Sequence, residues 1–246
     1  MNSKPVLNPK SSRSPQRALT IEFVGLPGAG KTTSSRAFSA LLQQKGFRVL
    51  ILQDVKDYLR RLSLGRKLLL VAKAVLTRTP KLVSYTASLA RNRIYSGNSI
   101  YRFIRLTLFD LALQQMKQEQ KADIILLEQW MIQELWSATI FKGRPLNQLE
   151  KQLQKYYFKT DFVLYFDLDV ATAARRIGWR KTNMSRFDRM EAERREEELM
   201  KYGAYLYELF QRSNCRQKHL YSARVAPEVN AASFMRQVEE QFSLSS

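Results

Sequence analysis

Residues 18–33 read ALTIEFVGLPGAGKTT, and this stretch decides the fold. Its first half, Ala18 to Gly25, is rich in β-branched and aromatic residues, which predicts a buried strand. Residues 25–32 match the Walker A pattern, a glycine-rich turn that ends in Lys-Thr. A helix is predicted from about residue 31 to residue 45, where Gly46 ends it. A strand, a glycine-rich turn and a helix in this order are the context in which the pattern binds phosphate.

The residue types in this loop each have a physical reason. Glycines let the backbone wrap so that its N–H groups point at phosphate oxygens, and the start of the helix adds positive potential. We expect Lys31 to reach the β- and γ-phosphates of ATP and Thr32 to place its hydroxyl on Mg²⁺. The predicted nucleotide contacts are Gly25, Gly28, Ala29, Gly30, Lys31, Thr32 and Thr33.

The remaining strands alternate with helices along the chain. Strands are predicted at 47–54, 122–128, 161–169 and 218–225. Because a right-handed crossover connects the first two strands of the chain, they are expected to run parallel. The pattern predicts an α/β fold, a three-layer sandwich around a mostly parallel five-stranded sheet. The predicted helices between and after these strands are at 129–157, 170–178, 189–213 and 227–241.

The chain divides into a tail and one domain. Residues 1–17 are rich in Ser, Pro and basic residues, which predicts a disordered tail before a single domain over 18–246. Within that domain, about 55–120 forms a basic helical insert, predicted as three helices broken near 79–80 and 96–98. Its apolar residues alternate with Lys and Arg, which fits an acceptor-binding lobe, an interfacial helix on anionic lipid, or ordinary packing with solvated basic faces.

The composition excludes several classes of protein. One cysteine, Cys215, leaves no intrachain disulfide and no zinc site built on cysteines. No stretch is long and apolar enough to predict a membrane-spanning helix, and the first residues lack the apolar centre of a secretion signal. We therefore expect a cytoplasmic protein, with peripheral attachment to a membrane as an alternative. The net charge of +19 indicates an anionic ligand, an anionic membrane surface or nucleic acid.

Two carboxylates follow strands at the edge where open parallel sheets bind ligands. Glu128 ends the third predicted strand, and we expect it to hold Mg²⁺ through water or to polarise an acceptor. Asp54 ends the second predicted strand and could take a proton from an acceptor hydroxyl as general base. An ordinary solvated carboxylate is the alternative for both, and Asp57 is a weaker substitute for Asp54.

A basic segment follows the fourth predicted strand. Arg175, Arg180 and Arg186 are candidates to stabilise the negative charge that develops on a transferring phosphoryl group. A solvated run of charges is the alternative. We expect Asp169, just before this segment, to cap the helix that follows it.

The loop, the strand ending at Glu128 and the basic segment together resemble thymidylate kinase-like P-loop kinases, which include nucleoside monophosphate and deoxynucleoside kinases. The resemblance covers roughly 18–55 and 120–225. It implies a parallel sheet with strand order 2-3-1-4-5 and a lid at about 175–188 that closes over ATP. The chain departs from the family at Gln129, where relatives usually carry an arginine that holds the acceptor.

These features predict a kinase that uses ATP and Mg²⁺ to phosphorylate a small anionic or hydroxyl acceptor. A hydroxyl acceptor would need a base such as Asp54, whereas a phosphate acceptor, already ionised, would need arginines. The alternative is a nucleotide-dependent ATPase or switch module, on an anionic membrane or nucleic acid. Among partners, an anionic membrane and a second copy of the chain are candidates, and nucleic acid is a weaker one.

Overall fold

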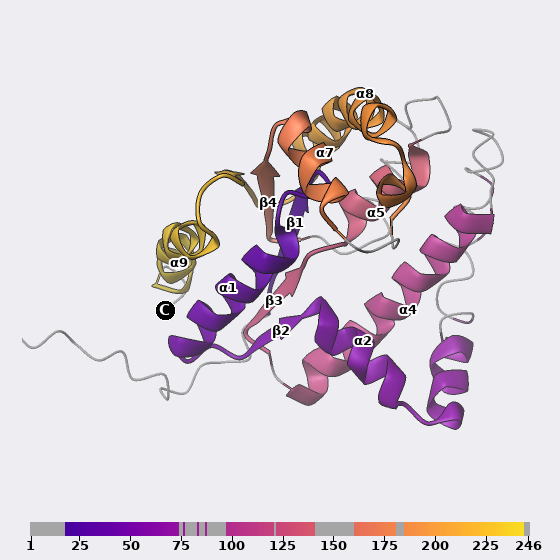
Figure 1. The fold of residues 1–246 in the computed structure, drawn as a ribbon. Helices are drawn as coiled ribbons and strands as arrows, with labels where there is room; N and C mark the ends of the chain where they lie inside the picture. The colour runs from indigo at the N-terminus through magenta and orange to yellow at the C-terminus, as the bar shows by residue number, and fades with distance from the viewer. Residues whose placement is uncertain are drawn as a thin grey trace, which may run out of the picture.

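The computed structural model describes residues 18–73, 76, 83, 87, 97–120, 122–140, 160–180 and 185–243. A five-stranded sheet with the order β2-β3-β1-β4-β5 lies at its centre (Figure 1). Every neighbouring pair of strands is parallel, so the predicted fold class and strand order are confirmed. The strands are β1 (Leu19–Gly25), β2 (Val49–Ile51), β3 (Ile124–Leu127), β4 (Phe162–Asp167) and β5 (Gln217–Ser222).

Helices cover both faces of the sheet. On one side α1 (Lys31–Gln44) packs against α9 (Pro227–Ser243), and on the other α5 (Met131–Thr139) packs against α8 (Ala192–Arg212) (Figure 1). The short helix α7 (Val170–Gly178) follows β4 and contacts α8. These helices and the sheet between them form the predicted three layers.

The central strand β1 is buried on both faces, as its apolar sequence requires. Phe23 points toward α1, where its ring centroid lies 5.2 Å from that of Phe38. The Phe38 ring in turn lies 5.4 Å from that of Phe234 on α9. Glu22 points to the opposite face because successive side chains of a strand alternate. Its Oε1 accepts a hydrogen bond of 2.8 Å from the backbone N–H of Ile132, at the start of α5.

The second strand is shorter than predicted. It ends at Ile51, and α2 (Leu52–Arg61) begins at the next residue. The prediction that Asp54 ends this strand is therefore wrong. Asp54 lies in the first turn of α2, and its Oδ2 accepts a hydrogen bond of 2.8 Å from the N–H of Ile51. This capping contact satisfies a backbone donor that the helix start would otherwise leave free.

The basic insert is helical where the structure describes it. It contains α2, a helix over residues 64–73, and α4 (Gly97–Gln120), whose start agrees with the break predicted near 96–98. The break predicted near 79–80 lies outside the described residues. Leu70 joins Leu62 and Leu111 in a small apolar cluster apart from the main core. Other residues of α4, including Leu106, Leu113 and Met116, are buried in the main core.

Several other predicted boundaries shift. The helix after β3 begins at Met131 and is described to Thr139, and the rest of the predicted range to 157 lies outside the described residues. The fifth strand ends at Ser222, three residues earlier than predicted. The tail at 1–17 also lies outside the described residues. None of the described helices is long and apolar enough to cross a membrane.

Replacing Glu22 with Gln should change how stability depends on pH. Burial raises the pKa of Glu22 from its ordinary value of 4.5 to about 8. Between these values the unfolded chain has lost a proton that the folded chain still holds. Wild-type stability therefore falls as pH rises through this window, by up to about 1.4 kcal/mol per pH unit.

The measurement is the Tm of Glu22→Gln and of wild type at intervals from about pH 5 to about pH 8. Groups common to both proteins cancel in the difference. We expect the Tm of the variant, relative to wild type, to increase steadily with pH. A difference that stays constant over this range would contradict a protonated, buried Glu22.

Candidate phosphate-binding site

The glycine-rich loop has the backbone that phosphate binding needs. Gly28 has φ 93°, and a Cβ built on it would lie 2.9 Å from the carbonyl oxygen of Ala173, so only glycine fits against α7 there. Gly30 has φ 77° and precedes α1, and no side chain among the described residues caps this helix end. The N–H groups of the first turn are therefore available to an anion, with the helix dipole behind them.

Lys31 lies across this loop. Its Nζ donates to the carbonyl oxygens of Gly25 at 2.7 Å and Leu26 at 2.9 Å. The pKa of Lys31 is lowered to about 7, chiefly by loss of hydration and also by the positive charge of Arg180, against the opposing charge of Glu128. The structure thus brings Lys31, Glu128 and Arg180 into electrostatic contact, although they come from three separate segments of the chain.

The residues predicted to hold Mg²⁺ have suitable chemistry. Thr32 is exposed in the first turn of α1, and Glu128 is half-buried directly after β3. No cluster of three or more acidic, His or Cys side chains capable of holding a metal occurs in the part of the chain described. A hydroxyl and one carboxylate suit Mg²⁺, which usually takes few protein ligands and completes its octahedron with phosphate oxygens and water.

The three candidate arginines of the lid have different environments. Arg180 is exposed and close enough to Lys31 to lower its pKa. Arg186 is half-buried and donates from Nη2 to the carbonyl of Ser137 on α5. Arg175 is exposed, with its guanidinium carbon 5.6 Å from the centre of the Trp179 ring. Only Arg180 therefore lies beside the phosphate-binding loop, whereas Arg186 lies against α5.

The far end of the lid is anchored by a residue that the sequence analysis missed. Arg195 on α8 is buried and donates to the carbonyl oxygens of Phe187 at 2.9 Å and Met190 at 2.6 Å. It also reaches the carbonyl of Ala174 on α7 at 3.3 Å. These bonds tie residues 187–190, at the end of the segment predicted as a lid, to α7 and α8. Arg195 was missed because it lies in a charged stretch of sequence whose residues are mostly exposed, so nothing there indicated a buried arginine.

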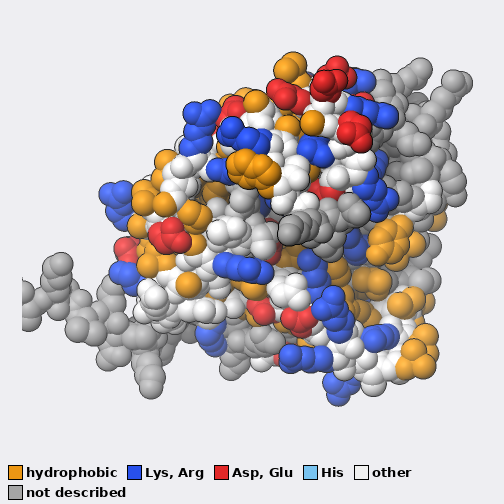
Figure 2. Space-filling model, viewed as in Figure 1, with side chains coloured by type: hydrophobic (Ala, Val, Ile, Leu, Met, Phe, Trp, Pro, Cys, Tyr) orange, Lys and Arg blue, Asp and Glu red, His pale blue; other side chains and the backbone are white. Residues whose placement is uncertain are grey.

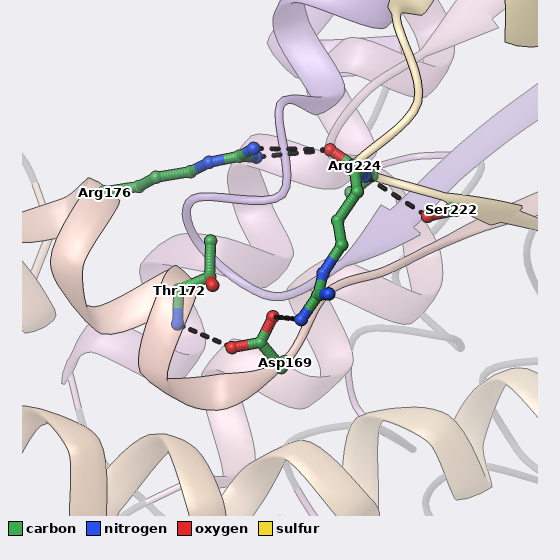
Figure 3. Close-up of polar contacts among 6 residues, drawn as sticks. Asp169, Thr172, Arg176, Ser222 and Arg224 are labelled. Carbon is green, nitrogen blue, oxygen red and sulfur yellow. Dashed lines mark hydrogen bonds and ion pairs between the residues drawn. The ribbon is translucent and has the colours of Figure 1, made fainter.

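A second arginine missed as a functional residue supports the loop itself. Arg176 on α7 donates to the carbonyl oxygen of Gly28 at 3.4 Å. It also donates to the carbonyl oxygen of Ala223 at 3.4 Å (Figure 3). It thereby ties the phosphate-binding loop to the turn after β5. Arg176 lies three residues after the buried Ala173, so it is on the inward side of the helix. This spacing is visible in the sequence and could have indicated its role.

Asp169 acts as predicted. Its Oδ1 accepts a hydrogen bond of 2.8 Å from the N–H of Thr172 and so caps α7. Its Oδ2 lies 2.7 Å from Nη2 of Arg224, in the turn after β5 (Figure 3). The bond to Arg224 and the capping bond hold the pKa of Asp169 well below its usual range. This carboxylate is therefore occupied in joining β4 to the turn after β5.

A group of arginines faces α5 from the acceptor side. Arg102 and Arg105 on α4 both pair with Glu134 on α5, with 2.8 Å between Arg102 Nη1 and Glu134 Oε2. Arg186 lies nearby, since burial and the charge of Arg102 both lower its pKa. The Nε of Arg102 is buried without a hydrogen-bond partner among the described atoms. Two guanidinium groups thus share the carboxylate of Glu134, and the third arginine bonds the backbone of the same helix.

The acids predicted at the end of β2 are engaged elsewhere. Asp54 caps α2 through Ile51, as described above. Asp57 accepts hydrogen bonds from Gln53 at 3.0 Å and from Arg60 at 3.3 Å within the same helix. Both carboxylates are therefore hydrogen-bonded to groups at the start of α2 or within it.

Gly28→Ala should disrupt the loop. The new Cβ would meet the Ala173 carbonyl at 2.9 Å in a backbone conformation that alanine rarely adopts. We expect a loss of about 1–3 kcal/mol of stability and of measurable ATP binding, monitored by thermal unfolding and calorimetry. Gly65→Ala is the matched control, because its Cβ would enter open space in a helix. It should raise stability by about 0.5–1 kcal/mol, and equal effects of the two changes would contradict this role for Gly28.

ATP binding should be accompanied by proton uptake. With a pKa of about 7, Lys31 is largely neutral at about pH 8, and a bound triphosphate would raise that pKa by charge attraction. We expect uptake of nearly one proton per ATP at about pH 8 and much less at about pH 6. Calorimetry in buffers of different ionisation enthalpy measures it. An uptake that does not change between these pH values would contradict a neutral Lys31.

No protein-family model matches the chain, and no curated protein is significantly similar to it. What the site can do therefore follows from its own residues. These are a loop shaped for phosphate, a lysine inside it, and a carboxylate and an arginine beside that lysine.

Proposed function

We propose that this chain binds ATP with Mg²⁺ in the loop at 25–32 and transfers the γ-phosphoryl group to a small acceptor. The observation that carries the proposal is the geometry of the glycine-rich loop, where Gly28 fits against α7 only as glycine and Nζ of Lys31 bonds the carbonyls of Gly25 and Leu26. Phosphoryl transfer depends mainly on positioning and on charge stabilisation, and these residue types supply both. The reaction is of the kind that thymidylate kinase-like P-loop kinases catalyse.

The chemistry assigns a role to each residue. An acceptor oxygen attacks the γ-phosphorus, the bond to the β,γ-bridging oxygen breaks, and ADP leaves with that electron pair. Lys31 and Arg180 stabilise the negative charge that spreads over the transferring group. Thr32 and Glu128 would hold Mg²⁺, which neutralises charge on the β- and γ-phosphates when it is bound.

The surroundings of the site favour an anionic acceptor over a neutral hydroxyl. Asp54, the candidate base, is hydrogen-bonded to the start of its own helix. Arg102 and Arg105 both pair with the one carboxylate of Glu134, so two positive charges meet one negative charge there and an anionic group could bind beside them. An acceptor phosphate is already ionised and needs arginines rather than a base.

The first experiment is an acceptor screen with ATP and Mg²⁺. Nucleosides, nucleoside monophosphates, sugars and lipid-linked alcohols are tested for phosphate transfer, with Lys31→Ala as the control. We expect transfer to a phosphorylated or otherwise anionic class, abolished in Lys31→Ala. ATP binding without transfer to any acceptor would contradict the kinase and favour an ATPase or switch module.

Two substitutions then separate the acceptor classes. Arg102→Gln should raise the KM for an anionic acceptor by about 10- to 100-fold and leave the KM for ATP unchanged, because it removes a charge-assisted contact. Asp54→Asn should keep most of the turnover. The exposed Arg212, which pairs with Glu208 on α8, supplies the matched control Arg212→Gln. A collapse of kcat in Asp54→Asn alone would instead indicate a hydroxyl acceptor.

A further inference from the structure

Charge is distributed unevenly along the chain. Residues 58–109 contain eight Arg and three Lys and no Asp or Glu, so this stretch holds more than half of the net charge of +19. We call this stretch the basic lobe. Among its described residues, Arg60 and Arg61 are exposed at the end of α2, and Arg66, Lys67 and Lys73 are exposed in the helix at 64–73. A long run without acids favours an anionic partner.

The same helix also exposes large apolar side chains. Leu64 is 74% exposed, Leu68 62% and Val71 46%. Their spacing places them on one face of the helix. Leu69 and Leu76 are exposed as well, at 70% and 82%. Figure 2 shows apolar and basic side chains gathered at the lower right, where Figure 1 places this helix.

The exposed leucines are not needed to attach the helix to the protein. Leu70 turns inward and is buried in the cluster with Leu62 and Leu111. The stripe of Leu64, Leu68 and Val71 therefore remains available to a partner. Burying such side chains gives about 25 cal/mol per Å² of apolar surface, so a partner that covers them gains affinity beyond charge attraction.

The basic side chains and the exposed apolar side chains together indicate which class of anionic partner fits this surface. Nucleic acid would attract the basic side chains but would leave the leucines in water. A second copy of the chain would bring another net charge of +19 against this surface. The surface of an anionic bilayer satisfies both features, because leucines enter the boundary of the acyl chains while Lys and Arg meet the lipid headgroups.

We propose that the helix at 64–73 lies on an anionic lipid surface, with Leu64, Leu68 and Val71 inserted and Lys67, at the flank of this stripe, on the headgroups. None of the described helices is long and apolar enough to cross a bilayer, and the contact that we propose is peripheral and reversible. The proposal does not depend on phosphoryl transfer, because none of these residues belongs to the phosphate-binding site.

The test is co-sedimentation of the full chain with two kinds of vesicle, pure phosphatidylcholine and mixed phosphatidylcholine–phosphatidylglycerol. We expect binding to the mixed vesicles only, weakened as salt rises. The double variant Leu64→Ser with Leu68→Ser should weaken binding at least about tenfold through lost apolar burial. Lys67→Gln should weaken it by about fivefold through lost charge attraction.

The matched control is Leu220→Ser with Val229→Ser. These side chains are 56% and 59% exposed but lie outside the basic lobe, so their loss should leave vesicle binding unchanged. The Tm of each variant confirms that it is folded. Absence of binding to the mixed vesicles would overturn the proposal. Binding that survives the loss of Leu64 and Leu68 would also overturn it, because attraction by charge alone, as for nucleic acid, would then account for the surface.

Discussion

The close packing of the phosphate-binding loop against α7 is the constraint on which the rest of the site depends. The loop can turn back toward the sheet only because Gly28 has no side chain to meet the Ala173 carbonyl. Arg176 then fixes the same stretch of α7 to the carbonyl of Gly28 and to the turn after β5. The loop, α7 and the last turn of the sheet therefore hold one another in place, and α1 begins with its N–H groups directed into the loop.

The loop directly follows β1, the buried central strand, and so it lies at the edge of the sheet where the parallel strands end. The neighbouring strands β3 and β4 run parallel to β1, so residues that follow all three strands meet at one edge. Glu128 and the segment that contains Arg180 reach Lys31 for this reason. Glu22, within β1, helps to position the start of α5, because its carboxyl accepts a hydrogen bond from the N–H of Ile132.

Positive charge has two separate roles in this molecule. One group of arginines converges on α5, half-buried and sharing Glu134, where an anionic group of a substrate could balance it. A second group, Arg66, Lys67 and Lys73, is exposed on the helix at 64–73, which also exposes leucines. The two groups differ in burial. Guanidinium groups held away from water need a specific counter-charge, whereas exposed ones are balanced by solvent ions or a charged surface.

Local sequence determined the elements whose signal lies within a few neighbouring residues. The apolar run before Gly25, the glycine-rich loop with Lys31, the alternation of strands and helices, and the cap at Asp169 were all predictable, because each follows from spacing and residue type alone. Tertiary structure decided the partnerships between distant segments. Periodicity could not show that Glu134 pairs with Arg102 and Arg105, that Arg195 holds the lid, or that Asp54 caps a helix instead of ending a strand. These contacts depend on which helix faces lie together once the sheet is covered, and that choice is made by the packing of the whole core.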